Sequence, residues 1–505
     1  MEYYEIRDFD LAGRIAKIRT KKGVIETPYL FPVIDPIRQE ITLDDIRKIG
    51  FNAIITNAYL LYRRKKSLVK DIHEIMKWDN VIMTDSGGYQ VLEYGDIEVT
   101  NKTIVEYEKK INVDIGVILD IPTGGHMDWN RAREAVEETF RRACEALPLI
   151  QDTDILWVLP VQGAPYKDLL LRSCIRAWRY NYHIYALGSP TVLLEKYEYS
   201  TLIELVALAR MILPPNKPLH VFGVGHPMII PFLVALGADL FDSASYVLYA
   251  RDNRYMVEEG TKRLEEIEYF PCSCPVCSKF EPKELLEMPS SERVKYLALH
   301  NVFMLRREIN RVKQAIREGR LWELIEYRSK AHPSLKSAFN VLKKYVGFME
   351  KYTPFSKGTS LALLLYDRES LYNPKIRIFR ERAKAYSEKR SNKLLLIPAV
   401  NKPYRQQDFL KDFDVLYKDY DIMFYNPFLG LIPWGASDSY PVFQHEEPKI
   451  ISDKELCREL AREIMDYVNR AKYKETVIVI KENVEWSKCL MNLIDKRLIK
   501  IITCT

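Results

Sequence analysis

Three cysteines and one histidine in the middle of the chain have the composition of a metal site. Cys272, Cys274 and Cys277 form a C-x-C-x-x-C motif, and His300 follows at the start of an expected helix. Three thiolates and one imidazole complete a tetrahedral shell around Zn2+ and leave no position for a reacting water. The alternatives are buried or redox-active thiols, which such close spacing disfavours, and an iron–sulfur cluster, which would need a fourth cysteine nearby. The pattern therefore predicts one structural Zn2+.

Three aspartates stand where apolar runs of the sequence end. Asp85, Asp120 and Asp242 each close a run that is expected to be a buried strand, where an ionisable side chain needs a specific reason. One alternative is that Asp85 and Asp120 cap the helices that follow. If the carboxyls meet on one face, a pair of them can cleave a glycosidic bond, one as the nucleophile and one as the general acid and base.

Glycines beside aromatic residues follow several of the same apolar runs. The clusters are Ser86-Gly87-Gly88-Tyr89-Gln90, Gln162-Gly163, Gly188 and Phe222-Gly223. Glycine lets the backbone approach a ligand closely, and the rings of Tyr89 and Phe222 could enclose a planar ring. The amide of Gln162 offers a donor and an acceptor, which suits the edge of a base. For the glycines alone, a tight turn between strand and helix is the better explanation, and no nucleotide-phosphate motif is present.

Eight short apolar runs in the first half of the chain predict the strands that must position these residues. They are too continuous for half-exposed strands, and amphipathic stretches such as 128–147 and 201–212 separate them. The runs are Tyr29–Ile34, Ala53–Asn57, Val81–Asp85, Ile115–Asp120, Ile155–Val161, His183–Leu187, Leu219–Val224 and Asp239–Asp242. Eight strands with crossovers favour a (β/α)8 TIM barrel over an open doubly wound sheet. The polar clusters at the strand ends would then converge on one face.

The character of the chain changes after about residue 265. A basic, helix-prone stretch follows the cysteines, and new strands at 360–366, 393–398 and 476–480 accompany a helix near 453–471. The sequence therefore predicts an α/β fold with two parts. These are a zinc-containing barrel at 1–345, with a zinc subdomain at about 265–345, and a C-terminal α/β accessory domain at 351–505.

Composition places the chain among soluble globular proteins. Of its 505 residues, 47% are apolar and 29% are charged, which excludes a disordered or collagen-like chain. The formal net charge of +6 permits an anionic partner without requiring one. The acidic N-terminus lacks the apolar core of a signal peptide, and no apolar stretch is long enough to span a bilayer. We therefore expect a cytoplasmic protein with no membrane partner.

Taken together, the motifs resemble those of the tRNA-guanine transglycosylases, and specifically their archaeal branch. The matching strings, in the family's order within residues 27–301, are TPYLFPVIDP, TNAY, TDSGGYQ, LDIPT, VQGAPYKDLL, ALGSP, HVFGVGHP, GADLFDSASY, CSCPVC and LALHN. The resemblance implies a zinc-containing (β/α)8 barrel. It also implies a pentosyltransferase that exchanges a guanine base of tRNA for a 7-deazaguanine without cutting the backbone.

The resemblance also implies a role for each matching residue. Asp242 corresponds to the nucleophile that attacks the ribose anomeric carbon, and Asp85 to the general acid and base. Asp120 and Gln162 correspond to residues that hydrogen-bond the purine edge. The rest of the base pocket corresponds to Ser86, Tyr89, Gly188 and Phe222. The zinc ligands correspond to Cys272, Cys274, Cys277 and His300.

Two motifs favour the archaeal branch over the bacterial one. LDIPT stands where bacterial enzymes typically read FDECP, and ALGSP replaces a glycine-rich loop that contains leucine. The long C-terminal extension also looks archaeal. In that branch the incoming base is 7-cyano-7-deazaguanine (preQ0) and the target is guanine 15 of the D-loop, a step in archaeosine biosynthesis.

Binding of tRNA needs a local positive field, because a net charge of +6 over 505 residues is diffuse. Arg306, Lys313, Arg317 and Arg320 are expected together on one face of the helix after the cysteines, beside an apolar stripe. We expect them to contact the tRNA backbone, with a solvated surface face as the alternative. No PUA domain of the archaeal enzymes is recognisable, so either a separate PUA-type protein supplies one or tRNA is held differently. Whether the chain forms a homodimer stays open.

Two other functions remain open at this stage. An archaeosine synthase-like paralogue would form an amidine, but the segment around Lys402-Pro403-Tyr404 lacks the accompanying cysteine, serine and histidine. Lys402 is therefore interpreted as a surface residue. A non-catalytic tRNA-binding subunit of the same fold would need neither Asp85 nor Asp242.

Overall fold

The computed structural model describes residues 2–64, 70–88, 99–124, 127–188, 190–385, 389–411 and 419–504. Contacts divide the chain into two compact units, residues 1–317 with 327–348 and residues 318–326 with 349–505. The second unit thus includes 318–326, which the sequence-based boundaries place in the first part. Those boundaries, 1–345 and 351–505, stay a prediction about functional domains.

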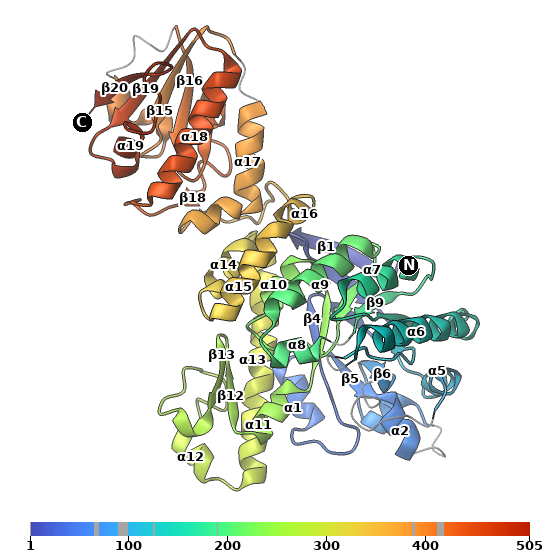
Figure 1. Ribbon diagram of the computed structural model, residues 1–505. Coiled ribbons are helices and arrows are strands. Elements are labelled where there is room, and N and C mark those ends of the chain that lie inside the picture. Colours follow the sequence, from blue (N-terminus) through green and yellow to red (C-terminus); the bar gives the residue numbers. More distant parts are fainter. Residues whose placement is uncertain are drawn as a thin grey trace. The chain divides into compact units, whose positions relative to one another are not determined.

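The first unit is built on a closed barrel of eight parallel strands (Figure 1). In chain order they are β4 (Tyr29–Pro32), β5 (Ala53–Asn57), β6 (Val81–Asp85), β7 (Ile115–Val117), β8 (Leu156–Val161), β9 (Ile184–Leu187), β10 (Leu219–Val221) and β11 (Leu240–Ser243). Each strand pairs with its neighbour in the chain, and β11 returns to pair with β4. A bridge between Val33 and Ile55 joins β4 to β5 and closes the ring. The predicted TIM barrel is confirmed.

Helices surround the strands because each crossover carries an apolar face that must be buried. The bounds are α1 (Leu43–Ile49), α2 (Ala58–Arg64), α3 (Ile72–Met76), α5 (Asn101–Lys110), α6 (Trp129–Ile150), α7 (Lys167–Ala177), α8 (Thr191–Glu195), α9 (Tyr199–Ile212), α10 (Ile230–Ala235) and α11 (Ser245–Arg251). Side-chain caps mark several starts: Thr42, Thr100 and Asp128 each accept a backbone N–H of the following turn. Strand residues of the barrel are almost all buried, as expected for a sheet covered on both sides.

A small antiparallel sheet is attached at the amino end of the barrel strands. It consists of β1 (Tyr4–Asp10), β2 (Gly13–Arg19) and β3 (Val24–Glu26). The guanidinium of Arg14 on β2 pairs with the buried carboxylate of Asp239, directly before β11. Asp239 also accepts the backbone N–H of Leu219 at 2.8 Å. This ion pair therefore joins the small sheet to two barrel strands.

The remainder of the first unit follows the last barrel strand. It contains the hairpin β12 (Arg254–Val257) and β13 (Gly260–Arg263), the short η1 (Leu264–Glu266), α12 (Pro282–Glu287), the long α13 (Ser290–Glu318), α15 (Pro333–Leu342) and η2 (Lys343–Tyr345). Helices α14 (Leu321–Ser329) and α16 (Val346–Glu350) cross the boundaries between the units. Arg328 and Glu308 form a buried ion pair at 3.0 Å.

The second unit is a five-stranded sheet with helices (Figure 1). Its strand order is β17 (Gly430–Pro433), β16 (Asp421–Asn426), β15 (Lys393–Pro398), β19 (Glu475–Lys481) and β20 (Lys500–Cys504), with only β17 antiparallel. Its helices are η3 (Arg368–Tyr372), α17 (Pro374–Ala385), η4 (Tyr404–Gln406), η6 (Trp434–Ala436), α18 (Lys454–Ala471) and α19 (Glu485–Leu490). The predicted strand at 360–366 is reduced to β14 (Leu363–Leu364), which pairs with β18 (His445–Glu446). Among the described residues, no helix has the length and apolar character required to cross a membrane.

Candidate active site and metal centre

The predicted site residues that the structure describes gather at the carboxyl ends of the barrel strands. Asp85 is the last residue of β6 and Asp242 lies on β11. Asp120 and Gln162 follow β7 and β8, while Gly188 and Phe222 follow β9 and β10. Parallel strands of a barrel direct these ends to one mouth, which is where barrel enzymes bind substrate. Tyr89 and Gln90 lie outside the described residues.

Asp242 is buried and its Oδ1 atom accepts two hydrogen bonds. His220 Nε2 lies 2.8 Å from Oδ1, and the backbone N–H of Gly223 donates to the same oxygen at 3.0 Å. Two N–H donors on one carboxylate oxygen stabilise negative charge on it. The arrangement holds the carboxyl in a defined orientation at the mouth, as a nucleophile requires.

Asp85 has a contrasting environment. Burial raises the pKa of its carboxyl to about 7, and the nearby carboxylates of Asp120 and Asp242 act in the same direction. The backbone N–H groups of Ser86 and Gly87 partly oppose this shift, and Asn57 donates to Oδ2 at 3.1 Å. An aspartic acid with a pKa near 7 can hold or release a proton at neutral pH, which suits a general acid and base.

Asp120 and Gln162 form a polar pair beside these carboxyls. Gln162 donates through Nε2 to Asp120 Oδ2, and the backbone N–H of Thr123 donates to Gln162 Oε1 at 3.3 Å. Burial raises the pKa of Asp120 to about 6, and the hydrogen bond from Gln162 opposes this shift. A fixed carboxyl and amide side by side can pair with the donor and acceptor edge of a planar heterocycle.

Two glycines make this polar pair possible. A Cβ atom at Gly188 would lie 2.1 Å from Gln162 Nε2, and one at Gly88 would lie 2.3 Å from Asp120 Oδ1. Both separations are far below van der Waals contact, so any larger residue would displace the amide or the carboxyl. The glycines noted in the sequence are therefore explained by side-chain packing as well as by turns.

His220 and Asn57 are site residues that the sequence interpretation missed. His220 lies on β10, its side chain is fully buried, and its ring centroid is 4.5 Å from that of Phe222. Asn57 is the last residue of β5. Both belong to motifs that had been singled out, HVFGVGHP and TNAY. The sequence does contain one signal for His220. Side chains alternate along a strand, so residues 220 and 222 lie on the same side, and Phe222 is a predicted site residue.

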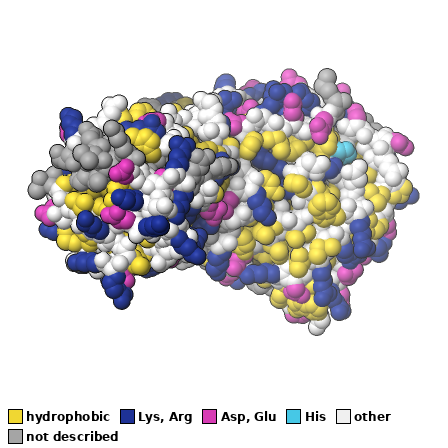
Figure 2. Space-filling view, turned by 90° about the horizontal axis from the view of Figure 1, so that it is seen from above, with side chains coloured by type: hydrophobic (Ala, Val, Ile, Leu, Met, Phe, Trp, Pro, Cys, Tyr) yellow, Lys and Arg dark blue, Asp and Glu magenta, His cyan; other side chains and the backbone are white. Residues whose placement is uncertain are grey.

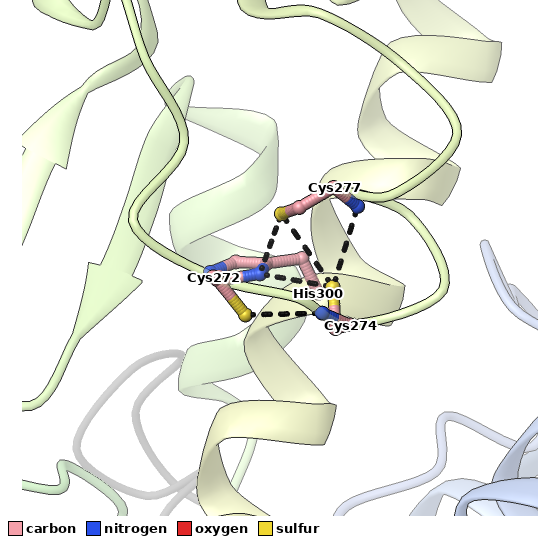
Figure 3. Close-up of side chains that lie close together, drawn as sticks. All are labelled: Cys272, Cys274, Cys277 and His300. Atoms are coloured by element: carbon pink, nitrogen blue, oxygen red, sulfur yellow. Dashed lines mark hydrogen bonds between the residues drawn. The ribbon is translucent and has the colours of Figure 1, made fainter.

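The four predicted metal ligands come together in the first unit (Figure 3). Their ligand atoms all lie within 4.8 Å of one another. The Sγ atoms of Cys274 and Cys277 are 3.5 Å apart, and each lies 3.4 Å from Nδ1 of His300. The edges of a tetrahedron with Zn–S and Zn–N bonds of ordinary length are roughly 3.5–3.8 Å. The cluster therefore has the size and the donor set of a metal site.

Contacts around the cluster orient the histidine for ligation. His300 Nε2 lies 2.8 Å from the carbonyl oxygen of Met256, so Nε2 carries the proton and Nδ1 presents its lone pair to the thiols. The ring of Tyr255 stacks on His300 at 3.7 Å between centroids, and its hydroxyl lies 3.2 Å from Cys277 Sγ. A metal held here joins the 272–277 loop to α13 and has no open position toward the barrel mouth.

The expectation of four basic residues on one helix face is wrong for Arg320. Helix α13 ends at Glu318, because Gly319 has a φ of +68° and breaks the helical path. Arg320 belongs to the second unit, where its guanidinium donates to the carbonyl of Ala362. A contact of this residue with RNA stays a prediction.

The other three basic residues lie on α13 in different environments. Lys313 pairs with Glu26 on β3 at 3.1 Å, and the guanidinium of Arg306 lies over the ring of Phe51 at 5.7 Å from its centroid. Arg317 is exposed near the end of the helix. Figure 2 shows a face of the molecule on which Lys and Arg side chains are scattered among Asp and Glu. The tRNA contacts of these residues stay a prediction.

Comparison with known proteins connects this geometry with one family. A family model described as queuine tRNA-ribosyltransferase matches residues 10–334. A tRNA-guanine(15) transglycosylase of Sulfolobus acidocaldarius is 44% identical over 94% of this chain and 95% of its own length. The protein of that name from Aeropyrum pernix is 45% identical over 92% of each chain. A third, from Methanocaldococcus jannaschii, is 39% identical over 94% of this chain and 73% of its own. This chain belongs to the queuine tRNA-ribosyltransferase family.

Proposed function

We propose that this protein is a tRNA-guanine(15) transglycosylase. It replaces the guanine at position 15 of the tRNA D-loop with 7-cyano-7-deazaguanine, a step in archaeosine biosynthesis. The relatives that cover almost the whole chain carry this name. The observation that carries the proposal is the difference between two carboxyls at one mouth. Asp242 Oδ1 accepts two N–H groups, whereas burial raises the pKa of Asp85 to about 7.

In the first half of the reaction, Asp242 displaces guanine from the ribose. A carboxylate oxygen forms a bond to the anomeric carbon, and the bond from that carbon to guanine N9 breaks. The bonding electron pair leaves with the guanine, which accepts a proton from Asp85. The product is a glycosyl ester between Asp242 and the intact tRNA chain, together with free guanine.

In the second half, the incoming base reverses these steps. Its ring nitrogen attacks the anomeric carbon and gives its proton to the carboxylate of Asp85. The electron pair of the ester bond returns to Asp242, which becomes a carboxylate again. The two bases are chemically similar, so one carboxyl with a pKa near neutrality can protonate the departing guanine and deprotonate the incoming base.

The polar pair Asp120 and Gln162 is proposed to bind the edge of both bases. Guanine and its 7-deaza analogue share the amide and exocyclic amino groups that a carboxyl and an amide can pair with. Gly188 lies directly against Gln162, so the base can approach the strand end closely. Ser86 and the ring of Phe222 are proposed to complete the pocket, and Tyr89 is proposed to stack on the base.

We propose that the metal of the Cys272, Cys274, Cys277 and His300 cluster is one structural Zn2+. When bound, it supplies a cross-link between the loop and α13. The donor set and the tetrahedral edge lengths favour Zn2+, because thiolate-rich closed shells are typical of structural zinc. Its part in catalysis is indirect, since it holds a helix whose basic residues are proposed to contact tRNA.

The direct test is the release of guanine from tRNA. The protein is incubated with tRNA that carries labelled guanine at position 15, with and without 7-cyano-7-deazaguanine. Release of more than one equivalent of label per protein is expected to require the incoming base, and tRNA with adenine at position 15 is the control. Tight tRNA binding without release would favour the non-catalytic subunit, and would overturn the proposal.

A further inference from the structure

His220 is a buried histidine at a position where an apolar residue would pack as well. Its side chain has no exposed surface, and Nδ1 has no hydrogen-bond partner among the described residues. Leaving a buried polar nitrogen without a partner is unfavourable, so a purely structural role would be better filled by an apolar residue. The polar interaction recorded for the ring is between Nε2 and Asp242 Oδ1, at 2.8 Å.

The same contact shows which ring nitrogen of His220 carries a hydrogen. Asp242 Oδ1 is an acceptor that already receives the N–H of Gly223, so Nε2 of His220 must carry a proton to bond with it. The ring is fixed from both sides, because it stacks on Phe31 at 15° between planes and lies against Phe222. His220 is therefore a rigid N–H donor aimed at one oxygen of the carboxylate.

Gly223 supplies the second donor through its backbone conformation. Its φ of +68° lies in the left-handed region, and a Cβ atom there would be 2.4 Å from Thr191 Cγ2. The glycine therefore turns its N–H toward Asp242 without a steric penalty. Both donors bind Oδ1 of Asp242. Neither of these two hydrogen bonds uses Oδ2, which can therefore face another partner.

We propose that His220 is a positioning residue that, with the Gly223 N–H, selects Oδ2 of Asp242 as the attacking atom. This inference rests on the proposed function. Oδ2 forms the bond to the anomeric carbon while the bond to the base breaks, and Oδ1 becomes the carbonyl oxygen of the ester. The two N–H groups remain on Oδ1 throughout, and the proton of His220 is not transferred. In the second half, they stabilise the charge that returns to the carboxylate as the ester bond breaks.

The test compares three substitutions that differ in the donor. His220→Leu removes it, His220→Asn places an amide too short to reach Asp242, and His220→Gln places an amide N–H at about the distance of Nε2. We expect the Leu and Asn variants to lower kcat for guanine exchange roughly 10- to 100-fold, with KM for tRNA and for the free base within about threefold. The Gln variant is expected to recover most of kcat.

Two further measurements separate positioning from folding. Adducts between protein and tRNA that survive denaturation are expected to form more slowly in the Leu and Asn variants, in single-turnover experiments at saturating tRNA. Thermal unfolding of the variants is compared with that of His183→Leu, which removes a half-buried imidazole before the amino end of β9. That control is expected to keep wild-type kcat.

Several outcomes would overturn the inference. Wild-type kcat in His220→Leu or in His220→Asn would show that the donor is dispensable. Equal loss in the Gln and Asn variants, with a parallel loss of thermal stability, would show that the ring serves packing. If the Leu variant does not fold, the comparison between Gln and Asn alone decides. Failure of the wild-type protein to release guanine would instead overturn the proposed function.

Discussion

After burial and the carboxylate of Asp120, Asp242 is the next cause that raises the pKa of Asp85 to about 7, although the two carboxyls come from β11 and β6, which stand three strands apart around the closed barrel. Closure of the barrel brings them to one mouth. At this mouth Asp242 accepts two N–H groups, whereas Asp85 is buried and has a raised pKa. Two side chains of one chemical type thus have different environments, as the two proposed roles require.

Replacement of Asp242 by Asn is expected to abolish exchange while the protein still binds tRNA. An amide oxygen cannot form the glycosyl ester, so guanine release should fall roughly 1,000-fold or more. Guanine release and denaturation-resistant adducts are measured for both proteins. The assignment of the nucleophile would be refuted by substantial exchange in the Asn variant.

Asp85→Asn is expected to stabilise the fold at alkaline pH. Because the folded state holds the Asp85 proton up to a pKa of about 7, against 3.8 when unfolded, it binds more protons between these values. Stability of the wild-type protein therefore falls as pH rises from about 4 to 7, and the loss is complete above 7. The Asn variant avoids this loss, so at pH 8 its free energy of unfolding should exceed that of wild type by roughly 2–4 kcal/mol. Denaturant unfolding of both proteins at pH 4 and pH 8 gives this difference in the free energy of unfolding. A difference between variant and wild type that is the same at both pH values would contradict the raised pKa.

Cys274→Ser is expected to lose bound zinc and to destabilise the segment that follows. The proposed metal would join the loop to α13, so its loss should lower the free energy of unfolding by several kcal/mol. Metal content and thermal unfolding are measured beside Cys144→Ser, which changes an exposed cysteine outside the cluster. A metal-free Cys274→Ser protein with wild-type stability and activity would rule out a structural zinc.

Gly188→Ala is expected to weaken binding of the free base without weakening binding of tRNA. The added methyl would lie 2.1 Å from Gln162 Nε2 and must push the amide away from Asp120. Affinity for 7-cyano-7-deazaguanine should fall roughly 10-fold or more, as for the loss of a good hydrogen bond. Gly347→Ala is the matched control, because nothing lies within 4 Å of its added methyl. If both variants bound the base with equal affinity, Gln162 would not be part of the base-binding site.

Replacing Arg306, Lys313, Arg317 and Arg320 together by Gln is expected to weaken tRNA binding and to flatten its dependence on salt. Each lost phosphate contact should reduce the slope of log affinity against log salt by about 1. Lys313 is paired with Glu26 and Arg320 lies in the second unit, so the four single Gln variants are measured as well, to show how much each position contributes. Affinity for the free base should not change. Identical salt slopes in wild type and the quadruple variant would place the RNA on another surface.

The sequence by itself determined the eight strands, the metal ligands and the candidate carboxyls. Strands and helices follow from local apolar periodicity, and the ligands from the spacing of Cys272 to Cys277, so both are encoded over short distances. Only the tertiary structure decided how the site works. The bridge from Val33 to Ile55 closes the ring, and the hydrogen bond from His220 to Asp242 joins neighbouring strands at its mouth. Charge, burial and donor geometry depend on neighbours far apart in the chain, which no local pattern encodes. The basic face was incomplete for a local reason: Gly319, with a φ of +68°, ends the helix before Arg320.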